Sequence, residues 1–80
     1  MKNEFDEALR EQFERVQLKI QKRQSSNLEI VNLLSKVVER HPELRFTQIL
    51  SALGLDKDRF YEESVDTLQD IKNRLENMGE

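Results

Sequence analysis

Apolar residues recur at every third or fourth position along almost the whole chain. This spacing is typical of amphipathic helices, whereas half-buried strands alternate polar and apolar residues. The pattern predicts an all-α fold: a small helical domain of three main helices plus a short helical turn, with a long amphipathic N-terminal helix. We divide the chain into residues 1–26, an N-terminal helix that serves as an oligomerisation or packing arm, and residues 27–80, a compact helical domain.

The first helix is expected to run from about Glu4 to Arg23, with Asn3 as its N-cap. Its apolar residues form one narrow stripe, namely Phe5, Leu9, Phe13, Val16 and Ile20. A stripe this narrow is more typical of coiled-coil packing against a partner helix than of a wide core-facing surface. We therefore predict a homo-oligomer, most simply a two-fold dimer, whose interface contains these five residues. The alternative is that the stripe closes the core of its own chain.

A second helix is expected at about 27–40. Ser26 and Glu29 have the spacing of a capping box, in which each side chain satisfies a backbone donor of the other residue. This favours a break between the first two helices; one continuous helix over residues 3–40 is the competing interpretation, because neither Gly nor Pro interrupts that segment. The residues expected to be buried here are Leu28, Val31, Leu34, Val37 and Val38.

The third helix is expected to begin at His41-Pro42, with Pro42 at the first helical position and His41 at or beside the N-cap. It should bury Phe46, Ile49, Leu50 and Leu53 and end at Gly54 in the left-handed conformation. Asp56 then caps a short helical turn that carries Phe60 inward. Ser64 caps the last helix, at about 65–78, whose expected inner residues are Val65, Leu68, Ile71, Leu75 and Met78.

Five polar or aromatic residues have no role in this scheme and form the predicted site for a ligand or partner: Arg45, Gln48, Tyr61, Glu62 and Glu63. Arg and Tyr are among the residues that most often anchor interfaces. The alternative for Arg45 is an ordinary ion pair with a nearby glutamate that clamps two helices together. Three bases at the end of the first helix, Lys19, Lys22 and Arg23, suit the helix dipole and solubility better than a binding site.

The size of the chain favours self-association. Eighty residues without cysteine make at most one domain, and a chain this short buries only about 60% of its unfolded surface. Disulfides are excluded, and a single histidine does not make a zinc site. DKDRFYEE lacks the glycine and the full set of oxygen ligands of a calcium loop. We therefore predict no metal and no cofactor.

Catalysis and membrane insertion are not expected. The single histidine is better explained as a helix cap, and Glu62 and Glu63 point about 100° apart on a helix, so they do not form an acid pair. The charged start has no signal-peptide core, and no apolar run reaches the roughly 20 residues of a membrane span. We predict a soluble cytoplasmic protein that is not an enzyme.

The segments HPELRFTQIL, LG, FYEES and TLQDI resemble small uncharacterised proteins of bacteriophages and prophages of Gram-positive bacteria, over roughly residues 28–75. The resemblance implies a phage accessory protein in the host cell cytoplasm that binds and sequesters or inhibits a host factor, such as an antiviral-defence protein or a signalling molecule. For a small anionic molecule, Arg45 would meet the charge and Tyr61 would stack. For a protein, the acidic segment 56–70 would steer it toward a basic surface.

Two other functions remain open. Helix–LG–helix spacing is typical of a helix-turn-helix, with FTQILSALG as the first helix and DKDRFYEES as the helix that reads DNA. However, the reading segment is acidic and the chain has a formal net charge of −3. Phosphates would therefore be repelled, and we do not expect nucleic acid as a partner. The third candidate is a structural, coiled-coil-like assembly adaptor.

Overall fold

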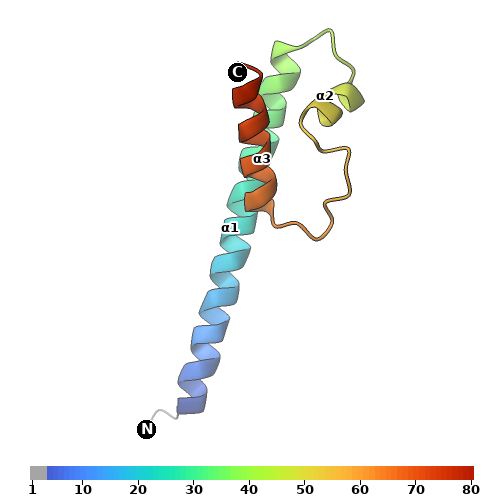
Figure 1. Ribbon diagram of the computed structural model, residues 1–80. Coiled ribbons are helices and arrows are strands. Elements are labelled where there is room, and N and C mark those ends of the chain that lie inside the picture. Colours follow the sequence, from blue (N-terminus) through green and yellow to red (C-terminus); the bar gives the residue numbers. More distant parts are fainter. Residues whose placement is uncertain (1–3) are drawn as a thin grey trace.

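The computed structural model describes residues 4–80 and confirms the all-α fold. It contains α1 (Glu4–Arg40), α2 (Phe46–Ala52) and α3 (Ser64–Asn77), and no strand occurs within residues 4–80. Figure 1 shows α3 lying along the C-terminal half of α1, with α2 beside the upper end of this pair. The expected N-cap, Asn3, lies outside the described residues.

Helix α1 is continuous across the predicted break, so the continuous alternative is correct over the described residues and the two-helix prediction is wrong. Ser26 is buried inside the helix and is not an N-cap. A side-chain cap contributes only about 1 kcal/mol, and neither Gly nor Pro interrupts the chain at this point. On either side of Ser26, ion pairs join α1 to α3 and its preceding loop. Arg23 pairs with Glu63, and Glu29 pairs with Lys72.

Helix α3 runs parallel to the C-terminal half of α1. The ion pairs show this direction, because residues 23, 29 and 41 of the first segment contact residues 63, 72 and 80 of the second in the same order. The long connection through α2 returns the chain to the middle of α1 before α3 begins (Figure 1). This return places the loop before α3 against residues 19–23 of α1.

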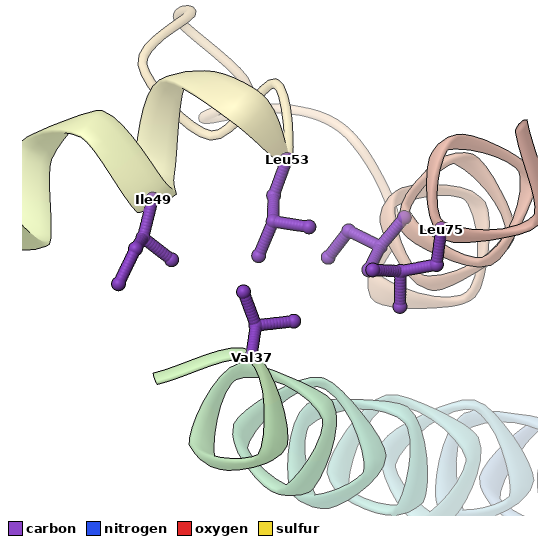
Figure 2. Packing of buried hydrophobic residues seen from close by; sticks show 5 residues of the cluster. Val37, Ile49, Leu53 and Leu75 are labelled. Atoms are coloured by element: carbon purple, nitrogen blue, oxygen red, sulfur yellow. The ribbon is translucent and has the colours of Figure 1, made fainter. Parts of the chain in front are cut away.

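The core lies where all three helices meet. Figure 2 shows Val37, Ile49, Leu53 and Leu75 pointing toward one another, and Ile71 completes this buried cluster. Leu68 is also buried. Partly buried residues surround the cluster: Ile30, Leu33, Leu34, Leu44 and Leu55. Each fully buried aliphatic side chain of this kind contributes about 1.5–3 kcal/mol.

The start of α2 differs from the prediction. His41 and Pro42 belong to the turn after α1, and Arg45 is the N-cap of a helix that begins at Phe46. The backbone N–H of His41 still donates to the carbonyl of Val37 at 3.1 Å, which extends the hydrogen bonding of α1. Proline therefore ends one helix here and does not begin the next.

The end of α2 agrees with the prediction. Gly54 has φ +71°. Its N–H donates to the Ser51 carbonyl at 3.0 Å, and the Leu55 N–H donates to the Leu50 carbonyl at 2.8 Å. These two bonds form a Schellman motif, which satisfies helix carbonyls that would otherwise lack partners. A side chain at position 54 would meet the Arg74 guanidinium at 2.6 Å.

No helical turn follows at Asp56. That residue accepts a hydrogen bond from the Ser51 hydroxyl at 3.1 Å, and the chain from 53 to 63 is a loop. The N-cap of α3 is Glu63, so the expected cap, Ser64, is the first helical residue.

Several residues expected in the core are exposed: Leu28, Val31, Val38, Phe46, Phe60, Val65 and Met78. Leu50 is half-buried. Helix α2 has only seven residues and α3 has fourteen, so together they cover one side of α1. No further helix or strand occurs within residues 4–80 to cover the other sides of these helices.

The N-terminal part of α1 extends beyond the other helices (Figure 1). The whole molecule therefore has an elongated shape, with dimensions of 65 × 21 × 19 Å. The stripe residues on it are between 45% and 66% exposed: Phe5, Leu9, Phe13, Val16 and Ile20. The stripe therefore does not close the core of its own chain, which was the alternative to an oligomer interface. We call residues 4–23 of α1 the arm.

Candidate functional site

The candidate site is built around the loop that precedes α3, and Arg59 fixes its shape. The Arg59 Nε donates to the Gly54 carbonyl at 2.8 Å, and Nη1 donates to Glu62 Oε1 at 2.6 Å. Its Nη2 pairs with Asp70 of α3. One side chain thus ties the end of α2, the loop and α3 together. We call residues 59–63 the Arg59 loop.

The carboxylates of this network are held in their charged form. The Thr67 hydroxyl, at 2.7 Å, and the Arg59 guanidinium lower the pKa of Glu62 from its ordinary value. Arg74 and then Arg59 lower the pKa of Asp70. Because these hydrogen bonds favour the ionised form, both carboxylates serve as acceptors in a fixed structural network.

Glu63 connects the Arg59 loop to α1. Its two oxygens accept from Arg23 Nε at 3.1 Å and Arg23 Nη2 at 3.3 Å, and this pairing lowers the pKa of Glu63. Both side chains are about half exposed, so solvent screens the pair and its contribution to stability is small. Glu62 and Glu63 thus have separate partners on different elements.

Phe60 and Tyr61 point outward from the Arg59 loop. Their side chains are 82% and 94% exposed, and the rings pack edge to face with centroids 4.9 Å apart. The expectation that Phe60 turns inward is wrong, because Arg59 takes the inward position at this point of the loop. The Phe60 N–H donates to Asp58 Oδ1 at 3.1 Å, which stabilises the turn that directs the aromatic residues outward.

Two shallow hollows lie next to each other at this loop and share Arg23, Glu63 and Ser64. The first encloses about 280 Å³, including open solvent, and the second lies beside the aromatic pair. Their remaining lining residues are Lys19, Lys22 and Val65 for the first, and Phe60, Tyr61 and Glu62 for the second. The basic residues at the end of the arm therefore adjoin the Arg59 loop.

Of the five predicted site residues, Tyr61, Glu62 and Glu63 lie together. Arg45 and Gln48 lie at the start of α2 and line neither hollow. The Gln48 Oε1 accepts the backbone N–H of Arg45 at 2.8 Å, so Gln48 caps its own helix. Arg45 is exposed and makes no ion pair with any residue of segment 4–80. The structure thus does not bring Arg45 and Tyr61 together, and it does not contain the predicted Arg45–glutamate clamp.

His41 has a structural contact at the end of α1. Its Nδ1 lies 3.1 Å from Glu43 Oε1, and its Nε2 contacts Glu80. Hydrogen bonds from Glu80 and then Glu43 raise the pKa of His41 from its ordinary value. The pairing joins the C-terminal end of α1 to the segment that follows α3.

The predicted site does not include Arg59, although Arg59 and Glu62 have the i, i+3 spacing of a local ion pair. Its other partners, Gly54 and Asp70, are brought close only by the return of the loop to α3. The Arg23–Glu63 pair, 40 residues apart, had no local signal either.

In the part of the chain that the structure describes, no three His, Cys, Asp or Glu side chains stand close enough to share a metal ion. None of its helices has the length and apolar composition needed to cross a bilayer. Comparison with protein-family models, curated proteins and solved structures found no match to this chain.

Proposed function

We propose that this chain is a non-enzymatic binding protein that acts by stoichiometric occupation of a target protein, with the Phe60–Tyr61 pair as its contact. The observation that carries this proposal is the outward aromatic pair on a loop that Arg59 fixes to α3. Aromatic residues are frequent energetic centres of interfaces. A loop that is already ordered loses less conformational entropy when it binds.

The charge around the aromatic pair indicates the kind of surface that it fits. Of the six acids in residues 56–70, three are paired with arginines: Glu62, Glu63 and Asp70. Asp56, Asp58 and Asp66 are exposed and form no ion pair within residues 4–80, so they supply the negative charge of this segment. Complementary charge steers association and suppresses wrong partners. The target is therefore a protein with a basic surface.

A small anionic ligand is a weaker candidate in this geometry. Arg45, the residue expected to meet the anion, is at the start of α2, whereas Tyr61 lies beside the second hollow. The resemblance to phage and prophage proteins supplies the context of the proposal: a host factor, such as an antiviral-defence protein, is bound and inhibited.

The other two candidate functions are affected differently by the structure. The segment proposed to read DNA, Asp56–Ser64, is a loop up to Glu63, so this helix-turn-helix interpretation loses its second helix. The assembly adaptor gains support from the arm, which projects with an exposed apolar stripe. Self-association through the arm is part of our proposal, because it would cover that stripe.

Affinity capture from a lysate of a Gram-positive host tests the target contact. We expect the wild-type chain to retain one host protein in a stoichiometric amount. Phe60→Ser combined with Tyr61→Ser should lose that protein. Leu28→Ser combined with Phe46→Ser is the matched control, because these residues are also exposed and apolar but lie elsewhere, and it should retain it. Equal retention by both double variants would contradict the assigned contact.

A further inference from the structure

The arm carries two separate patterns, one apolar and one charged. Together they indicate which partner packs against the arm and in which direction. The apolar pattern consists of Leu9, Phe13, Val16 and Ile20, each at least 45% exposed. At 3.6 residues per turn, the centre of this stripe lies about 60° around the helix from that of Ile30, Leu34 and Val37, which face the core. The stripe is therefore close to a continuation of the α3-facing side of α1 beyond the beginning of α3.

The charged pattern divides the arm into two halves of opposite sign. Residues 4–14 contain five acids and one base, whereas residues 15–23 contain no acid and four bases. The acids are Glu4, Asp6, Glu7, Glu11 and Glu14, and the four bases are Arg15, Lys19, Lys22 and Arg23. The arm thus has formal charges of −4 and +4 on two halves of about equal length.

From these two patterns we infer that the arm pairs with the arm of a second copy in the antiparallel direction, with the two-fold axis near Phe13. An antiparallel pair places each acidic half beside a basic half. A parallel pair would place acid beside acid and base beside base, which is unfavourable at close range. The helix dipoles also favour the antiparallel direction.

The position of α3 limits the overlap of the two arms. The loop and α3 begin to cover α1 at Lys19–Arg23, where the first hollow also includes Val65. Two arms that overlap over residues 4–23 bring the acidic first turn of one copy to this hollow on the other. There it meets Lys19 and Lys22, whereas Arg23 is paired with Glu63 of its own chain.

Spin labels test the direction of the pair, which rests on the self-association proposed above. The chain has no cysteine, so Gln12→Cys and Gln24→Cys give single labels at two uncharged positions that flank the stripe. In the antiparallel pair the two Gln12 positions lie about 5 Å apart along the axis and the two Gln24 positions about 30 Å apart, from a rise of about 1.5 Å per residue. We expect a short distance for position 12 and a long one for position 24, measured on the full chain by electron paramagnetic resonance.

Equal distances at the two positions would show a parallel pair and overturn this inference, while the proposed self-association would stand. A chain that stays monomeric at high concentration would overturn both. Neither result changes what the capture experiment shows, because Phe60 and Tyr61 lie outside the arm.

Charge reversal gives a second readout. Lys19→Glu with Lys22→Glu brings the formal charge of residues 15–23 from +4 to 0. This removes the attraction between the halves at both ends of an antiparallel pair, so the dissociation constant should rise at least about tenfold at low salt. In a parallel pair the same change would remove the repulsion between two halves of charge +4, so the dissociation constant would fall. The control, Lys36→Glu with Lys57→Glu, changes the net charge by the same amount at positions outside the arm. It should change the dissociation constant by less than about twofold.

Discussion

Arg59 determines the shape of the loop that carries the proposed contact. Its side chain is only 17% exposed and contacts Gly54, Glu62 and Asp70. The inward position of this charged residue is what leaves Phe60 and Tyr61 outside. A guanidinium suits this position because its planar fork can serve several acceptors at once.

Replacing Arg59 with Met should lower the free energy of unfolding by about 2–3 kcal/mol, because hydrogen bonds to charged groups contribute about 1.5–3 kcal/mol and the Gly54 carbonyl loses its side-chain donor. Urea denaturation followed by circular dichroism measures this change. Arg45→Met is the control, because Arg45 makes no ion pair within residues 4–80, and it should change stability by less than about 0.5 kcal/mol. Equal losses in the two variants would contradict the role assigned to Arg59.

We expect the free energy of unfolding to depend on pH through His41, with a sign set by the direction of its pKa shift. Contacts with Glu80 and Glu43 raise its pKa in the folded chain, so folding favours the protonated form. The stabilisation is fully present below the unfolded pKa of about 6.5 and is lost as the pH rises through the folded pKa. His41→Gln should therefore destabilise the protein at acidic pH and have a smaller effect at alkaline pH. The single histidine can be titrated directly by NMR, and a pKa at or below the unfolded value would refute this account.

Helix α1 shows which parts of the fold follow from sequence and which do not. The spacing of apolar residues predicts helices at about residues 4–23, 27–40 and 65–78, and Gly54 predicts the end of α2, because these are local properties of the backbone. The capping box at Ser26 is a local signal too, but a cap contributes only about 1 kcal/mol, and it does not interrupt a helix that contains neither Gly nor Pro.

Burial was less predictable than helicity. The helical period identifies an apolar face, but whether that face is covered depends on how many other elements reach it. Two short helices cover Val37 and leave Val31 and Val38 exposed on the same helix. The grouping of Tyr61 with Glu62 and Glu63 follows from their being neighbours in sequence. Arg45, in contrast, lies at the start of α2 and lines neither hollow.

The continuity of α1 has a direct test. Ser26→Ala should leave the free energy of unfolding unchanged or raise it by up to about 0.5 kcal/mol, because alanine is the better residue inside a helix. Loss of a real N-cap would instead cost about 1 kcal/mol. Ser25→Ala is the matched neighbour, also within α1 but exposed, and should behave the same way. A clear loss for Ser26→Ala alone, measured by thermal or urea denaturation, would support a break in the helix.

The molecule as a whole consists of a small core at one end and a charged arm at the other. The core contains only a few buried apolar residues, and the arm exposes further ones on a helix 37 residues long in total. Isolated helices are only marginally stable in water, and most helices in proteins depend on packing of an apolar face. In our proposal a second copy supplies that packing, and the division of the arm into acidic and basic halves sets the direction of the pair.

The mass of the protein in solution tests this account most directly. Sedimentation equilibrium of the wild-type chain at high micromolar concentration should give twice the chain mass of 9.6 kDa. Leu9→Asp with Phe13→Asp should give the mass of one chain, because charges then replace the centre of the stripe. Leu28→Asp with Phe46→Asp should keep the doubled mass, because these exposed residues lie outside the arm. A wild-type chain that sediments as a single copy at every concentration, with its arm still helical, would contradict the account.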